Sequence, residues 1–286
     1  MPSGKQVVVV TDSTADLPRE LTAQHNLEII PLNLVWGGQT YRDGLDIDST
    51  TFFQRLRSER EFPTTSQPSP AAFLEGWQRA APDPETPILS IHIASTLSGT
   101  VASAEAAKKM ISGRTIEIVD TYSASLGQGL IVLAAARAAE AGQSLEECTA
   151  IARALIPRVH ILLIVDTLEY LHRGGRIGGA ARLLGTMLNL KPLLDLAEGR
   201  GRLEPLARIR TRAKAVDRML EIARERIAGR PAHIAALHTA DPDECARLAE
   251  RVRGLFDCRE LILGQVGSAI GAHVGPGALG MAFYTE

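Results

Sequence analysis

The sequence predicts an α/β protein of two domains, a mostly parallel sheet with flanking helices followed by a mixed α/β sheet. Three observations lead to this fold class. The 286 residues are enough to build two hydrophobic cores. Short apolar runs alternate with helical segments from residue 7 onward, and such an alternation of strands and helices is typical of parallel sheets. The pattern changes after Pro157, and we therefore expect domains at residues 1–157 and 158–286.

The first half contains the strand-like segments of the parallel sheet. "VVVV" is a short continuous apolar run, typical of a strand that is covered on both faces. The longer run "EIIPLNLVW" is interpreted as one strand, with Gly37 and Gly38 as its turn. The expected strands are residues 7–10, 28–36, 88–94 and 115–120.

Helix starts in this half are marked by polar N-cap residues, some with proline or glutamate in the first turn. An alanine-rich segment after residue 100 predicts a further helix. The expected caps are Asp16 before a helix that ends near residue 26, Asp48 before residues 49–60, Ser69 before a helix through Trp77, and Ser144 before one that stops at Pro157.

The second half mixes hairpin and helix signals. Two apolar runs on either side of Gly199 and Gly201 indicate a β-hairpin. The segment 212–227 places its apolar residues on one helical face. The remaining strands are expected at residues 160–166, 233–239 and 260–266, with a helix that starts near residue 241 between the last two.

The composition is that of an ordinary globular protein, with 45% hydrophobic and 22% charged residues. A net charge of -2 gives no global reason to expect nucleic acid or an anionic membrane as a partner. The chain lacks both a signal-peptide core and a window of about 18 apolar residues, the length that a spanning helix needs. We therefore expect a cytoplasmic protein without nucleic acid as a partner and without stable membrane insertion.

The cysteines and histidines do not form the spacings of metal or disulfide sites. Three cysteines are widely separated, and seven histidines are scattered along the chain. We expect neither a metal nor a cofactor.

Four segments rich in hydroxyl-bearing and small residues indicate a binding site. In open α/β sheets, ligands lie beyond the carboxyl ends of the strands. Taken singly, Ser95 and Ser98 are better explained as helix caps, and for Asp12 capping and binding are equally good explanations. The number and common position of the segments favour binding. They are residues 11–14, 63–70, 95–100 and 267–280.

Two glycine-rich motifs do not identify a specific binding site. "GPGALG" at 275–280 matches G-x-G-x-x-G, but that fingerprint needs a long helix after it, and only six residues follow. "HRGGRIGG" at 172–179 either cradles an anion or separates two helices. Ser95 and His273 would in principle serve as a nucleophile and base, although no orienting carboxylate is identifiable.

Seven motifs together resemble one family along nearly the whole chain. They occur in the order "VTDSTADLP", "PTTSQPSP", "ASTLSGT", "DTLEYLHRGGRIGG", "LNLKPLL", "RIRTRAKAV" and "GAHVGPGALG". This order resembles that of the DegV family of bacterial fatty-acid-binding proteins. The resemblance implies two α/β domains with a long-chain fatty acid, such as palmitate, between them. It also implies a carrier that presents the acid to a separate fatty acid kinase for lipid synthesis.

The resemblance also implies which residues hold the fatty acid. Its motifs carry the carboxylate contacts over to Thr65, Ser95 and His273, although many relatives have two serines where this chain has Ala94 and Ser95. Further pocket candidates in the same motifs are Asp12, Ser13, Ser66, Ser98, Gly99 and Arg176.

Two other classes of function remain open at this point. One is an enzyme, a hydrolase or small-molecule kinase that uses Ser95 and His273. The other is a regulatory or interaction protein without a lipid role. For the fatty acid carrier, the basic stretch "RIRTRAK" at 208–214 predicts kinase docking through Arg210 and Arg212, because charges at the rim of an interface speed association.

Overall fold

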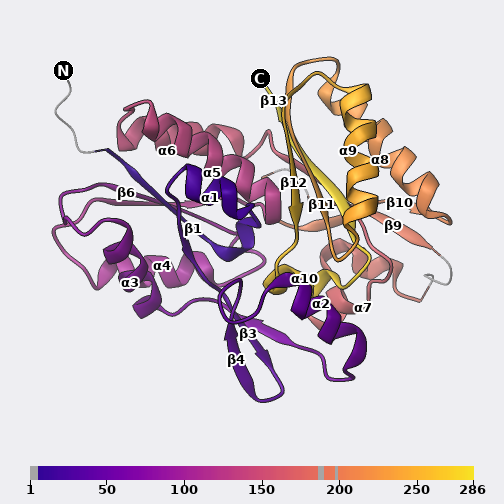
Figure 1. The fold of residues 1–286 in the computed structure, drawn as a ribbon, viewed down its shortest axis with the longest axis horizontal. Coiled ribbons are helices and arrows are strands. Elements are labelled where there is room, and N and C mark those ends of the chain that lie inside the picture. Colours follow the sequence, from indigo (N-terminus) through magenta and orange to yellow (C-terminus); the bar gives the residue numbers. More distant parts are fainter. Residues whose placement is uncertain (1–5, 186–189, 197–198) are drawn as a thin grey trace.

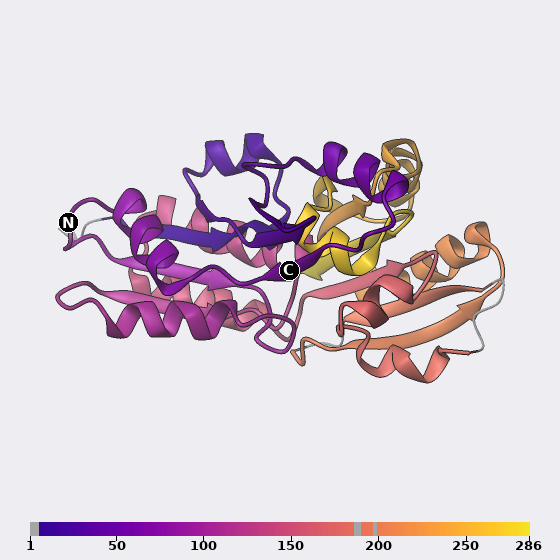
Figure 2. The same cartoon turned by 90° about the horizontal axis from the view of Figure 1, so that it is seen from below.

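Two sheets lie side by side along the long axis of the molecule (Figures 1 and 2). The computed structural model describes residues 6–185, 190–196 and 199–286. One sheet is parallel throughout and the other is mixed, which confirms the predicted α/β class.

The parallel sheet belongs to the first half of the chain. In spatial order its strands are Glu28–Ile30 (β2), Val8–Asp12 (β1), Ile88–His92 (β6) and Ile116–Asp120 (β7). The helices on its faces are Pro70–Ala80 (α3), Thr100–Lys109 (α4), Ser125–Glu140 (α5) and Leu145–Leu155 (α6). Val10 and Ile88 belong to the core under α3 and α4, whereas Val9 and Leu89 belong to the core that contains α5. The sheet is therefore covered on both faces.

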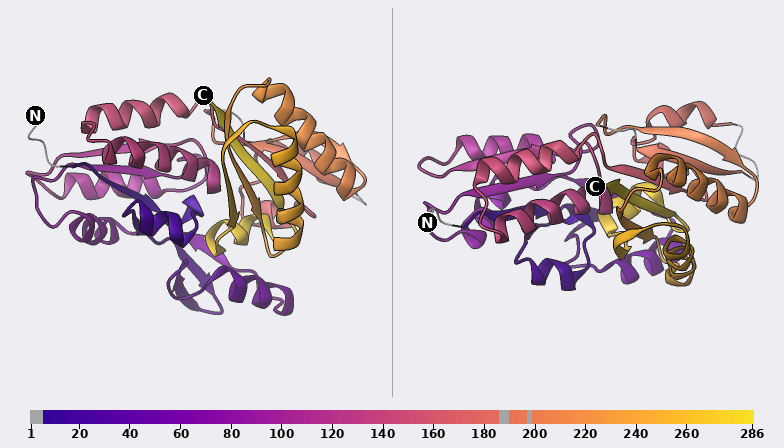
Figure 3. Two further views of the ribbon diagram at one scale, coloured as in Figure 1. Left: turned by 45° about the horizontal axis from the view of Figure 1, so that its top comes forward. Right: turned by 90° about the horizontal axis from the view of Figure 1, so that it is seen from above.

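The mixed sheet belongs to the second half. In spatial order its strands are Leu203–Ile209 (β10), Lys191–Leu196 (β9), His160–Ile164 (β8), Leu279–Thr285 (β13), Ala232–His238 (β11) and Cys258–Gln265 (β12). Leu162 and Ile164 pack toward the helices Arg212–Ile227 (α8) and Pro242–Leu255 (α9) on the outer face (Figure 3). Ile161 and Leu163 point the other way, into the core that contains α5.

Helix α5 lies between the two sheets and was not predicted from the sequence. It contacts β1 and β6 of the parallel sheet and β11 and β13 of the mixed sheet, and nearly all of its residues are buried. A helix that is apolar all round has no amphipathic pattern to reveal it. Gly127 lets the side chain of Ile161 come within 2.4 Å of where a Cβ would stand. The two halves thus share one core, and the domain boundary at residue 157 stays a prediction.

A small third sheet carries part of the site. Its strands in spatial order are Gln39–Arg42 (β4), Asn33–Trp36 (β3) and Thr64–Ser66 (β5). The prediction of one strand over 28–36 is wrong, because β2 and β3 belong to different sheets. Pro31 lies at the break, and proline cannot donate a backbone hydrogen bond to a ladder. Gly37 and Gly38 form the predicted turn, both with positive φ.

The remaining helices are short or lie at the junction of the halves. They are Ser13–Ala15 (η1), Arg19–Gln24 (α1), Ser49–Ser58 (α2), Glu169–Arg173 (α7), Gly178–Leu183 (η2) and Ser268–Val274 (α10). The predicted caps Asp48, Ser69 and Ser144 are confirmed. The prediction for Asp16 is wrong, because its carboxylate accepts the backbone N–H of Gly267 at 2.8 Å instead.

In the second half of the chain one predicted hairpin is present, and two elements near the C-terminus were not predicted. The hairpin of β9 and β10 is confirmed, although residues 197–198 of its turn lie outside the described residues. Helix α10 and strand β13 were not predicted, and β13 lies in the middle of the mixed sheet. "GPGALG" leads into this strand rather than into a helix, in agreement with its rejection as a dinucleotide site. Among the residues that the structure describes, no helix is long and apolar enough to cross a membrane.

Candidate functional site

A cavity lies between the two sheets, and both halves of the chain line it. The space between protein atoms there is about 900 Å³, and part of it is open to solvent. Most of its lining is aliphatic. The mixed sheet and α10 contribute Ile161, Leu163, Leu196, Leu203, Leu237 and Val274.

Two polar side chains of the cavity, those of Thr65 and His273, are bonded to each other, and Arg176 lies near them. Oγ1 of Thr65 lies 2.7 Å from Nε2 of His273. The guanidinium of Arg176 donates from Nε to the carbonyl oxygen of Leu97 at 3.0 Å and from Nη1 to that of Gly174 at 2.6 Å. These contacts place Arg176 beside the two loops that carry Ser98 and support His273. We call this part of the wall the polar end, and its lining is Thr65, Ser66, Gln67, Ser98, Arg176 and His273.

Arg176 brings to this end a positive charge that no carboxylate of the described residues pairs with. Its hydrogen-bond partners in the described part of the chain are two neutral carbonyls rather than a carboxylate. A half-buried guanidinium without an acidic partner favours an anionic ligand.

The local structure explains why Thr65 and His273 meet. Thr65 pairs with Leu34 in the small sheet, and alternation along a strand directs both side chains to the face that packs on α10. On the other side of α10, a Cβ at Gly174 would stand 2.1 Å from Nδ1 of His273. Glycine at position 174 is therefore required for the imidazole to occupy its place.

His273 is neutral at physiological pH. Burial, together with the positive charge of Arg176, lowers the pKa of His273 to about 4. Its Nδ1 atom is buried and makes no hydrogen bond within the described residues. An unpaired acceptor is easier to leave there than an unpaired N–H, which favours the tautomer protonated at Nε2. In that tautomer His273 donates to Thr65, and the Thr65 hydroxyl is free to donate to a ligand.

Two further hydroxyls of the cavity wall are occupied by the protein itself. The Ser125 hydroxyl donates to Oδ2 of Asp16 at 2.5 Å. The Thr14 hydroxyl is bonded to the carboxylate of Asp12. Neither is available to a ligand without loss of an internal bond.

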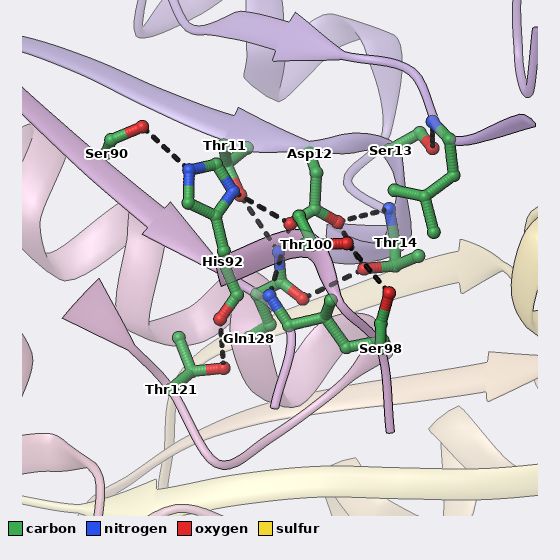
Figure 4. A network of polar contacts seen from close by, with 12 residues as sticks. Thr11, Asp12, Ser13, Thr14, Ser90, His92, Ser98, Thr100, Thr121 and Gln128 are labelled. Atoms are coloured by element: carbon green, nitrogen blue, oxygen red, sulfur yellow. Dashed lines mark hydrogen bonds and ion pairs between the residues drawn. The ribbon is translucent and has the colours of Figure 1, made fainter. Parts of the chain in front are cut away.

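Asp12 lies behind the cavity wall and joins two of the loops (Figure 4). Its carboxylate accepts the backbone N–H groups of Thr14 and Ile93 at 3.0 and 3.1 Å and lies 2.9 Å from Nδ1 of His92. Burial acts to raise the pKa of Asp12, but these bonds outweigh it and lower the pKa. Asp12 therefore holds the loops after β1 and β6 together as a charged, fully buried anchor.

The same network contains a serine, histidine and aspartate in the order of a hydrolase triad. Nε2 of His92 lies 2.7 Å from Oγ of Ser90, which also accepts the indole N–H of Trp77 at 3.0 Å. Ser90, His92 and Asp12 are all 0% exposed. No substrate can reach the hydroxyl, so the arrangement is structural (Figure 4).

The structure brings only some of the predicted site residues together. Ser95 is exposed, lies outside the cavity lining, and donates its backbone N–H to Asp120 at 3.2 Å. Ser98, three residues on, lines the cavity instead. The predicted residues in the lining are Thr65, Ser66, Ser98, Arg176 and His273, and those outside it are Asp12, Ser13, Ser95 and Gly99.

The outlying residues have other contacts. The Ser13 hydroxyl accepts the backbone N–H of Leu32 at 3.0 Å. A Cβ at Gly99 would stand 3.1 Å from the side chain of Gln67, a cavity residue that the sequence analysis did not single out although it belongs to the "TTSQPS" motif. The alternative enzyme pair of Ser95 and His273 is not assembled, because Nε2 of His273 faces Thr65.

The two arginines predicted to dock a kinase differ in their surroundings. Arg210 is exposed. Arg212 begins α8 and pairs with Glu244 of α9 at 2.6 and 2.8 Å. The guanidinium of Arg212 thus joins two helices, and the bidentate geometry leaves it poorly placed for a partner. Within the described ranges, no cluster of histidine, cysteine, aspartate or glutamate is arranged to hold a metal ion.

The fold and the cavity define an α/β protein with an apolar ligand site between two sheets. The profile of the DegV family, described as an uncharacterised protein family, matches residues 6–286. The chain belongs to the DegV family. A DegV domain-containing protein of Streptomyces coelicolor is 41% identical over 97% of this chain and 98% of its own length.

Solved structures of the family share the fold over their full length. A DegV family protein from Thermus thermophilus, described by its fatty acid binding, is 41% identical with a TM-score of 0.91, covering 98% of this chain and 100% of that one. DegV of Bacillus subtilis, described as a fatty acid binding protein, is 32% identical with a TM-score of 0.89, covering 99% and 100%.

Proposed function

We propose that this protein binds one long-chain fatty acid in the cavity between its sheets. The observation that carries the proposal is an aliphatic cavity with polar residues in its wall. They include a bonded threonine and histidine and an arginine that pairs with no carboxylate of the described residues. Such a site matches a ligand with a long apolar tail and one anionic group. The fatty acid binding described for the Thermus and Bacillus relatives supports the same ligand class.

The tail supplies most of the affinity. Burial of one CH₂ group stabilises by about 0.8 kcal/mol, so a sixteen-carbon chain offers on the order of 11 kcal/mol before association and ordering costs are deducted. The aliphatic residues of β8 to β11 are the surface for this burial.

The head group is held by hydrogen bonds from hydroxyls and by the charge of Arg176. Thr65 donates its hydroxyl to the carboxylate while accepting from His273, and Ser98 supplies a second hydroxyl. We assign the serine contact to Ser98 in place of Ser95, because Ser98 is in the cavity lining and Ser95 is not. Ser98 already exchanges a hydrogen bond of 2.8 Å with Thr100, which orients its hydroxyl.

The protein acts as a carrier without chemistry of its own. We propose that it presents the carboxyl group to a separate fatty acid kinase and that the exposed Arg210 contributes to docking. Arg212 is withdrawn from this role, because its guanidinium is engaged by Glu244. Arg210→Glu is expected to slow phosphorylation of the bound acid at low salt and to leave its affinity unchanged.

A head-group comparison tests the binding mode. We would titrate the lipid-free protein with palmitate and with hexadecanol, which share a tail length and differ in charge. Palmitate is expected to bind at least tenfold more tightly than hexadecanol, and Arg176→Gln is expected to remove most of that difference. Equal affinity for both in the unaltered protein would contradict the assignment of the polar end.

A further inference from the structure

Two carboxylates from the first half of the chain, the buried Asp43 and the half-buried Asp16, hold the start of helix α10. Oδ1 of Asp16 accepts the backbone N–H of Gly267 at 2.8 Å. Oδ1 of Asp43 accepts the backbone N–H of Ser268 at 2.9 Å and the hydroxyl of the same residue at 2.6 Å. Asp16 comes from the loop after η1, and Asp43 follows β4. Two separate segments are therefore hydrogen-bonded to the N-terminal end of the helix that carries His273.

The two carboxylates converge on a single residue. A Cβ at Gly267 would stand 2.9 Å from Oδ1 of Asp16 and 3.4 Å from both carboxylate oxygens of Asp43. Burial raises the pKa of Asp16 well above its usual range, and the nearby charges of Asp43 and Asp12 raise it further. Burial also raises the pKa of Asp43. A raised pKa favours the protonated, uncharged form of each carboxyl group, which lessens the repulsion between the pair.

Helix α10 depends on such contacts for its position. It spans seven residues, Ser268–Val274, and a helix this short is not stable by itself. Its far end carries His273, less than two turns from Ser268. A shift of the helix start would therefore move the imidazole relative to Thr65, which lies on the small sheet.

We propose that Asp16 and Asp43 are positioning residues that set the place of His273 in the cavity. They act through the helix start, not through contact with a ligand. Their effect on fatty acid affinity rests on the proposed function, whereas their effect on the His273 ring does not. The two effects are therefore measured separately.

The first measurement follows the imidazole of His273 by NMR titration in the lipid-free protein. Asp43→Ala removes the acceptor for two hydrogen bonds, and Ser268→Ala removes only one. We expect the pKa of His273 to rise from about 4 toward its ordinary value of 6.5 as the ring leaves its buried place, more in Asp43→Ala than in Ser268→Ala. Asp16→Asn keeps an oxygen that can accept the Gly267 N–H, whereas Asp16→Ala removes it. The low pKa of His273 is therefore expected to persist in Asp16→Asn and to be lost in Asp16→Ala.

Asp241→Ala is the matched control. Asp241 also caps a helix through a backbone N–H, that of Glu244 in α9, at 2.9 Å, and it is absent from the cavity lining. Its removal is expected to leave the pKa of His273 unchanged. An unchanged pKa in both Asp43→Ala and Ser268→Ala would overturn the proposal, and Ser268→Ala decides the question if Asp43→Ala fails to fold.

The second measurement is a double-mutant cycle on palmitate affinity. We expect Ser268→Ala to weaken binding about threefold and Asp43→Ala about tenfold when His273 is present, and each to have less than a twofold effect in His273→Ala. Residues that act through one another are non-additive in this way. Additive losses would overturn the proposal. If no variant and no parent protein binds palmitate, the proposed function fails while the NMR result still decides the role of the carboxylates.

Discussion

The pKa of His273 reports on the site, because the charge of the imidazole depends on its burial and on the ligand in the cavity. Its pKa of about 4 means that the folded protein holds the ring neutral. The unfolded chain protonates the same ring below about pH 6.5. Since the folded pKa is the lower one, the stability that neutral His273 contributes is complete above pH 6.5 and is lost as the pH falls toward 4.

Palmitate is expected to raise the pKa of His273. The bound carboxylate brings a negative charge next to the ring and offsets the effect of Arg176. NMR titration of His273 with and without palmitate measures the shift, and hexadecanol serves as the uncharged control. A pKa that stays at its lipid-free value in the palmitate complex would place the carboxylate elsewhere.

Removal of single hydroxyls is expected to distinguish the two serines. Thr65→Val and Ser98→Ala should each weaken palmitate binding by about 1.5–3 kcal/mol, the range for hydrogen bonds to charged groups. Ser95→Ala makes the same chemical change outside the cavity and should have no effect. Isothermal titration of the three variants checks this, and a loss confined to Ser95→Ala would restore the original assignment.

At the scale of elements, glycines determine how closely α10 approaches its neighbours. Gly174→Ala would place a methyl group 2.1 Å from Nδ1 of His273, so the ring must move and palmitate affinity should fall at least tenfold. Gly254→Ala in α9 meets nothing within 4 Å and should be neutral or slightly stabilising. Comparable loss of affinity in both variants would show that the effect of Gly174 is not local.

The elements that the sequence revealed are those with a local signal. Caps at Asp48, Ser69 and Ser144 act on backbone groups three residues away, so their pattern is visible in the sequence. Helix α5 is buried along nearly its whole length, and α10 is fixed by carboxylates more than two hundred residues away. Their positions depend on tertiary contacts that no local pattern encodes.

The same distinction applies to the site. Thr65 and His273 were assigned through motif resemblance, and the structure connects them across 208 residues. The sequence could not show the path of the loop after β6, in which Ser95 is exposed and Ser98 lines the cavity. The proposed serine contact therefore moved from Ser95 to Ser98. The sequence predicts a free surface charge at Arg212, whereas in the folded chain Glu244 of α9 pairs with it.

At the scale of the whole molecule, a ligand in the cavity would join the two halves. Its lining comes from both sheets, so a bound fatty acid should stabilise the folded chain cooperatively. Palmitate at a hundred times its dissociation constant should add about 2.7 kcal/mol to the free energy of unfolding. Thermal unfolding should then move up as one transition, and a shift of only part of the transition would indicate that the halves unfold separately.

The most direct test of fatty acid binding is the mass of the protein as purified. Native mass spectrometry should show an added mass of one long-chain fatty acid per chain, lost on denaturation and recovered as free fatty acid in the organic extract. The account predicts that the stripped protein regains this mass when palmitate is supplied. A purified protein that carries no fatty acid, and that takes up neither palmitate nor oleate after stripping, would contradict it.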